Sequence, residues 1–103
     1  MTYRYTVRAF FEEQEVADEW VRWLRDGHCR EVLSGGARRA EILQIEDATN
    51  GFEVRYDFAD RTSFETYERI HAPGLRDEGL ALFPVERGIR YERACGTVIH
   101  EEG

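Results

Sequence analysis

The sequence contains no lysine, and all 14 of its basic residues are arginine. Arginine makes planar, bidentate contacts that lysine cannot make, but a genome of biased base composition produces the same usage, and we favour that explanation. Positive charge is scarce as well, since 21 acidic residues leave the chain with a net charge of −7 at pH 7. Phosphate binding needs a basic surface, so we expect no nucleic-acid partner.

Long apolar runs are also missing. No segment approaches the roughly 18 consecutive apolar residues of a membrane-spanning helix, and the N-terminal MTYRYTVRAFF does not have the pattern of a signal peptide. We therefore expect a cytoplasmic protein with no membrane partner. The two cysteines, Cys29 and Cys95, stand far apart without a CxxC pair, which predicts reduced thiols.

What remains is the composition of a folded protein, with 42% hydrophobic and 34% charged residues. Its 103 residues predict a single domain that spans residues 1–103. Residues 3–11 alternate between apolar and polar side chains, which predicts a half-buried strand. Apolar residues spaced three and four apart then predict an amphipathic helix over residues 13–33, weakened at Gly27 and ended by Ser34-Gly35-Gly36.

The dipeptide Asn50-Gly51 is a strong hairpin signal, and it predicts two strands over residues 38–46 and 52–59. If these two residues form the whole turn, the strands pair in a definite register. That register places Ile45 opposite Tyr56 and Leu43 opposite Phe58 on the apolar face, with Glu46 opposite Arg55 and Gln44 opposite Asp57 on the polar face.

A second helix is predicted over residues 63–83, with Thr62-x-x-Glu65 as its capping box. The stretch His71-Ala72-Pro73-Gly74 interrupts it, because a proline disfavours helical geometry at the residue before it and suits the first turn of a new helix. A last strand over residues 88–99 follows, with Ile89, Tyr91 and Cys95 on one face.

The order strand, helix, strand, strand, helix, strand predicts an α+β protein with the ferredoxin-like βαββαβ arrangement. In this arrangement an antiparallel sheet carries both helices on one face. We expect Val7, Val54 and Tyr56 to lie beneath those helices.

Two stretches, EWVRWLRDGHCREVLSGG and YERIHAPGLRDEGLALFP, resemble the signatures of a small bacterial family catalogued only as a domain of unknown function. The resemblance spans nearly the whole chain. It implies a ferredoxin-like fold that pairs as a dimeric α/β barrel, hence a homodimer, and it implies no reaction. The chain departs from the family pattern at Gly79, where the family often has a histidine.

His28, near the end of the first helix, and His71, at the break in the second, are the candidate catalytic residues. Antiparallel helices would place them at similar depth, where they could face one another beside Arg76 or Glu78 and bind a carboxylate or shuttle a proton. The alternative is that both imidazoles cap helix-end carbonyls and have no chemical role. No HxH or HxxxH spacing accompanies them, so we expect no metal.

The polar face of the sheet carries four arginines against three carboxylates in an acidic chain. Solvated strands give the same alternation of charge, and for an isolated monomer that is the default interpretation. If two sheets close face to face, these charges must pair with one another or with an anionic ligand. Arg4, Arg55 and Arg90 are therefore further candidate ligand-binding residues.

Three classes of function remain open. The first is binding of a small anionic or aromatic molecule in a pocket between helices and sheet, with cofactor-free acid–base chemistry at His28 and His71. The second is a ligand-sensing module without chemistry, and the third is a purely structural dimerisation domain. A cavity reached by polar groups distinguishes the first two classes from the third.

Overall fold

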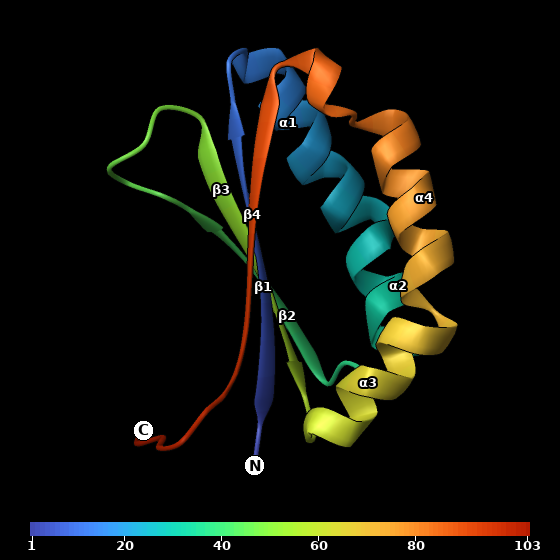
Figure 1. Ribbon diagram of the computed structural model, residues 1–103. Coiled ribbons are helices and arrows are strands. Elements are labelled where there is room, and N and C mark those ends of the chain that lie inside the picture. Colours follow the sequence, from blue (N-terminus) through green and yellow to red (C-terminus); the bar gives the residue numbers. More distant parts are fainter.

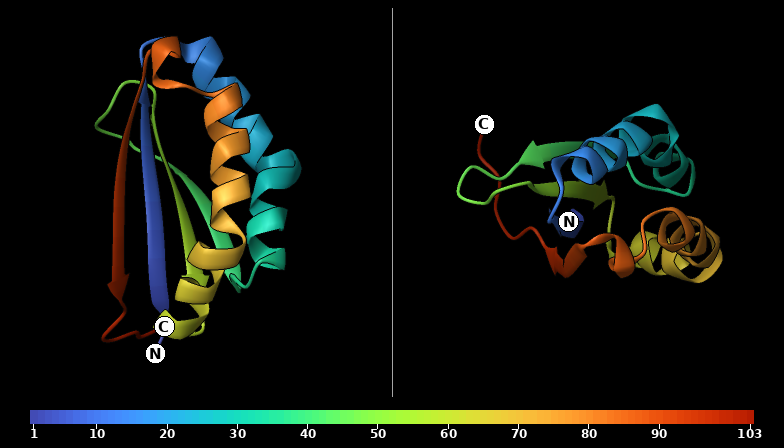
Figure 2. Two further views of the ribbon diagram at one scale, coloured as in Figure 1. Left: turned by 45° about the vertical axis from the view of Figure 1, so that its right-hand side comes forward. Right: turned by 90° about the horizontal axis from the view of Figure 1, so that it is seen from above.

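The computed structural model describes all residues of the chain, 1–103, and places a layer of helices on one face of a four-stranded antiparallel sheet (Figure 1). The strands lie in the order β2-β3-β1-β4 and comprise β1 (Tyr3–Phe11), β2 (Arg39–Gln44), β3 (Gly51–Phe58) and β4 (Ile89–Thr97). The helices are α1 (Gln14–Trp23), a π-helical turn (Leu24–His28), α2 (Cys29–Ser34), α3 (Arg61–Ile70), α4 (Ala72–Leu82) and a short 3-10 helix (Val85–Arg87). This order confirms the predicted ferredoxin-like arrangement. Figure 2 shows that the other face of the sheet carries no helix.

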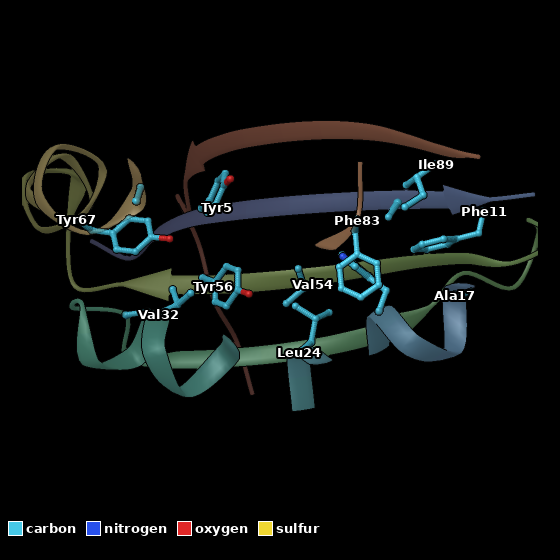
Figure 3. Close-up of a cluster of buried hydrophobic side chains, with 14 of the residues drawn as sticks. Tyr5, Phe11, Ala17, Leu24, Val32, Val54, Tyr56, Tyr67, Phe83 and Ile89 are labelled. Atoms are coloured by element: carbon cyan, nitrogen blue, oxygen red, sulfur yellow. The ribbon is translucent and has the colours of Figure 1, made fainter. Parts of the chain in front are cut away.

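The hydrophobic core fills the space between the sheet and the helices (Figure 3). Val54 and Tyr56 are each only 2% exposed, and Val7 is half-buried beneath the helices. The predicted facing of these strands is therefore confirmed. None of the helices is both long and apolar enough to cross a membrane.

The predicted register of the hairpin was wrong. Residues 45–50 form a longer connection than the two-residue turn, and Ile42 pairs with Val54 while Leu43 pairs with Glu53. The change is an odd number of residues, and an odd shift moves every side chain of β2 to the opposite face of the sheet. Leu43 consequently lies on the open face, 45% exposed, instead of in the core.

The predicted capping box at the start of α3 was also wrong. Asp60 precedes the helix in an extended conformation, and its carboxylate accepts a hydrogen bond of 2.8 Å from the backbone N–H of Ser63. This hydrogen bond lowers the pKa of Asp60, so the cap is ionised at neutral pH. Thr62 instead offers only its backbone carbonyl, which accepts a hydrogen bond from the Thr66 hydroxyl.

The break in the second helical segment is confirmed. α3 ends at Ile70, His71 has a less regular backbone, and α4 begins at Ala72 with Pro73 in its first turn. Proline fits there because the first N–H groups of a helix have no partner within the helix. The Arg76 guanidinium bridges the break by donating to both carboxylate oxygens of Glu68, at 3.1 and 3.3 Å.

The first helical segment differs from its prediction near Gly27. It is not merely weakened there but changes to π-helical geometry, in which the backbone N–H of Cys29 donates to the carbonyl of Leu24. Such five-residue hydrogen bonds are rare and occur mostly as single turns inside α-helices, frequently at functional sites.

The capping arrangement predicts that Asp60→Ala lowers the melting temperature by several degrees, because an unpartnered helix N–H replaces the hydrogen bond from Ser63. Thr62→Ala serves as the control, since it keeps the backbone carbonyl that Thr66 uses. Thermal unfolding followed by circular dichroism measures both. If Thr62→Ala lowered the melting temperature more than Asp60→Ala, the helix would be capped by Thr62, as the sequence predicted.

Candidate functional site

A cavity opens between the helices and the inner face of the sheet. Its volume is about 590 Å³ with its solvent-open mouth included. Twelve of its 16 lining residues are hydrophobic. This is room for a small molecule and not for a segment of a macromolecule.

Aromatic rings make up much of the wall. Four tyrosines and two tryptophans contribute, namely Tyr5, Tyr56, Tyr67, Tyr91, Trp20 and Trp23. Figure 3 shows that the hydroxyls of Tyr56 and Tyr67 point toward the middle of the row of buried side chains. Such a wall favours a flat, aromatic ligand, because stacked and edge-on ring contacts add to the free energy of apolar burial.

Burial governs the ionisation of these phenols. It raises the pKa values of Tyr56 and Tyr67, and it raises that of Tyr5 against the opposing charges of Arg93 and Arg76. The hydroxyls are therefore neutral at physiological pH and keep their hydrogen-bond donors, although that of Tyr56 also lies within reach of the Cys29 Sγ. The Tyr91 hydroxyl is already committed, since it donates to the Phe83 carbonyl at 2.8 Å.

His28 is the one histidine on the cavity wall. Its ring stacks on Trp23 with a centroid separation of 4.1 Å and an interplanar angle of 21°. Its Nδ1 is buried and has no hydrogen-bond partner. Burial lowers the pKa of His28 from 6.5 to about 4, so the imidazole is neutral at physiological pH and can accept a proton.

Two arginines are the charged residues of the cavity, and no carboxylate lines it. Arg76 is paired with Glu68, whereas Arg93 takes no part in any ion pair of the chain. Arg93 lies on the edge strand β4, directly opposite Val7 of the neighbouring strand β1. It also lines a hollow on the open face of the sheet. The cavity is therefore cationic in a chain whose net charge is −7.

His71 does not line this cavity, so the structure does not bring the two histidines together there. Its side chain is exposed, and its ring lies 6.5 Å from the Tyr67 ring. It packs against Gly35, where an added Cβ would approach the His71 Cγ to 3.1 Å. His71 thus joins the start of α4 to the end of α2.

Glu78 lies outside the cavity, in a groove between α4 and the first helical segment. Glu19, Asp26 and Glu31 share that groove with it, so the groove is acidic. His28 and Trp23 line both the groove and the cavity. The stacked pair is therefore the partition between a cationic interior and an acidic exterior.

The other predicted arginines lie on the open face of the sheet and do not reach the cavity. Arg4 donates to Asp57 at 2.8 Å, Arg55 pairs with Glu53, and Arg90 lies over the ring of Phe10 at 4.3 Å. Glu53 is 2% exposed; burial alone would raise its pKa, but hydrogen bonds from Arg8 and Arg55 outweigh burial and lower it.

Both cysteines are free thiols, as predicted. Cys29 lies with its Sγ 4.0 Å from the Tyr56 hydroxyl, and burial raises its pKa, which disfavours the reactive thiolate. No group of three or more His, Cys, Asp or Glu side chains is placed to hold a metal ion.

Sequence reasoning missed Arg93, although a signal was present. Ile89, Tyr91 and Cys95 were predicted to share one face of the last strand, and Arg93 falls on the same alternation. An arginine among apolar residues on one face of a strand is a candidate for binding an anion, and the Arg93 side chain is exposed.

Residues 3–87 match a family model described as a domain of unknown function, DUF4286. Among curated proteins, none matches the chain. Several solved structures share its fold. A dimeric ferredoxin-like protein from an uncultured marine organism is 15% identical, with 98% of each chain covered and a TM-score of 0.77.

Two further structures come from Streptomyces. A variant of SnoaB, described as a cofactor-independent oxygenase from Streptomyces nogalater, is 15% identical, with 97% of this chain and 95% of that chain covered and a TM-score of 0.72. A monooxygenase from the gene ActVA-Orf6 of Streptomyces coelicolor, in complex with Nanaomycin D, is 10% identical, with coverage of 98% and 92% and a TM-score of 0.67. These likenesses confirm the ferredoxin-like fold.

The half-buried imidazole predicts that His28 titrates in the folded protein with a pKa of about 4, below its ordinary 6.5. The unfolded chain binds the proton that the folded state excludes, so this residue lowers stability as pH falls from about 6.5 to about 4. A histidine NMR titration, with His28→Gln to assign the signals, measures the midpoint. As pH falls from about 6.5 to about 4, the melting temperature of the wild type should drop relative to that of His28→Gln. A midpoint near 6.5 would contradict the desolvation of the ring.

Proposed function

The chain belongs to the DUF4286 family of unknown function, and we propose that it binds a small aromatic molecule carrying an anionic group in the cavity between helices and sheet. The observation that carries this proposal is the charge of the wall: two arginines and no carboxylate in a chain of net charge −7. Arg93 has no protein partner, so a ligand carboxylate or phenolate would be its counter-ion. The aromatic wall suits the ring of such a ligand.

His28 is the proton acceptor of this site. Its neutral imidazole faces an acidic hydrogen of the bound ligand; the ligand's bond to that hydrogen breaks, an N–H bond forms on the ring, and the electron pair stays on the ligand. Arg76 and Arg93 stabilise the resulting anion by their charge. A negative ligand also favours the protonated imidazole, which raises its basicity above that of the empty cavity. Among proteins of this fold, SnoaB is described as cofactor-independent, and proton abstraction by a side chain needs no cofactor.

A ligand-sensing module without chemistry is the second candidate, and the low pKa of His28 favours it. An imidazole with a pKa of about 4 is a weak base unless the ligand raises that value. The two candidates differ in one variant. His28→Gln would keep binding in a sensor but abolish conversion of the ligand in an enzyme.

We also propose that two copies of the chain pair through the open faces of their sheets. That face presents Leu43, 45% exposed, among ion-paired charges that no helix covers. Alternating charges of both signs allow the same face to meet itself about a two-fold axis. A protein of this fold is described as dimeric.

The cationic cavity predicts that aromatic carboxylates raise the melting temperature, while their neutral amide analogues do not. Arg93→Gln should abolish the shift by removing the free cation. Arg90→Gln is the matched control, because Arg90 lies on the same strand over Phe10 and outside the cavity. Equal shifts from acids and neutral analogues, or an unchanged shift in Arg93→Gln, would refute the anionic ligand.

The dimer predicts a solution mass of about twice 12.1 kDa by size-exclusion chromatography with light scattering. Leu43→Asp should give a monomer, because it adds a charge to the face where the sheets meet. Leu33→Asp, at a position 38% exposed on α2, is the matched control and should stay dimeric. A wild-type protein that is monomeric at tens of micromolar would contradict this pairing and would mean that the open face is exposed to solvent.

A further inference from the structure

Trp23 and His28 are stacked although five residues separate them. In an α-helix with 3.6 residues per turn, residues five apart point roughly 140° away from each other around the axis. Side chains that meet on one face of an α-helix are three or four residues apart. Regular geometry therefore cannot produce this contact.

The π-helical turn at Leu24–His28 allows the two rings to meet. Its hydrogen bond from the Cys29 N–H to the Leu24 carbonyl spans five residues, so the turn holds one residue more than an α-helical turn. The extra residue brings positions five apart onto the same side of the helix. The irregular turn and the stacked rings are thus one feature.

Gly79 makes room for the same tryptophan from the opposite side. It lies inside α4, and a Cβ built on it would come within 3.1 Å of the Trp23 Cη2 atom, in the tightest range of real contacts. Glycine inside a helix costs about 1 kcal/mol relative to alanine, so its place there needs a reason. The indole edge against α4 supplies that reason.

His28 has little else to orient it. Its Nδ1 is buried without a partner, and the ring takes part in no ion pair. Trp23, in contrast, is fixed on two sides, by Gly79 and by Phe83, whose ring centroid lies 5.4 Å away. The stack is therefore the contact that sets the direction of the imidazole on the cavity wall.

We infer that Trp23 is the positioning residue of His28, and that the π-helical turn and Gly79 together hold the two rings in register. The role in catalysis rests on the proposed function of His28 as proton acceptor. The position of the ring does not, since it is a property of the free protein. The two claims can therefore fail separately.

Gly79→Ala tests the inference, with Gly74→Ala as the matched control in the same helix, where an added Cβ meets nothing within 4 Å. In the free protein, the His28 ring-proton NMR signals should move downfield in Gly79→Ala as the shielding indole is displaced. The titration midpoint should rise from about 4 toward 6.5. In Gly74→Ala both should stay at their wild-type values.

Trp23→Leu should produce the same two changes more strongly, and Trp23→Phe, which keeps a ring, should restore part of the wild-type shift. If Trp23→Leu does not fold, Trp23→Phe alone is expected to move the signals in the same direction by a smaller amount. Unchanged His28 signals and midpoint in Gly79→Ala and in the folded Trp23 variant would overturn the inference. A positive result without any ligand-induced thermal shift would leave the positioning intact and refute the proposed function.

Discussion

The site depends on how two interrupted helices cover one face of a single sheet. Regular helices pack closely onto a sheet and fill the space beneath them. Here the first segment changes to π-helical geometry at Leu24–His28, and the second breaks at His71. Between these irregular points the layers leave a cavity, and both interruptions place polar residues near it. Regular packing at either end of the core, as around Phe11 and Phe58, keeps the gap local.

Charge is separated by the same layers. The cavity holds Arg76 and Arg93 without a carboxylate, the groove outside it is acidic, and the open face of the sheet pairs its arginines with Glu53, Asp57 and other acids. Of the two cavity arginines, Arg76 is paired with Glu68, and Arg93 takes part in no ion pair of the chain. Arg93 is exposed, so water solvates it in the empty cavity, and an anionic ligand would replace that water with a charge-assisted hydrogen bond. An anionic ligand in the cavity would therefore bind beside Arg93, the unpaired cation of its wall.

The sequence was sufficient for the fold because period-two and helical patterns are local. The element order, the facing of β1 and β3 and the break at His71 followed from them. The hairpin register did not, because residues 45–50 close a longer loop than Asn50-Gly51 alone, and loop length decides which face Leu43 occupies. The capping box failed for a related reason. Asp60 and Thr62 both match capping chemistry, and the position where the extended chain turns into α3 decides between them.

The candidate site was predictable only in part, and His28 shows why. Its position near the end of the first helix could be predicted from the sequence. Its contact with Trp23 could not, because residues five apart in an α-helix lie on different sides of the helix. One trace of that geometry was visible on the other helix. Gly79 departs from the family pattern and weakens α4, and its position makes sense only once an indole ring lies against it. A glycine that is locally unfavourable inside a helix indicates a close contact with another element. Here Gly79 lies against Trp23, and Trp23 stacks on the imidazole of His28.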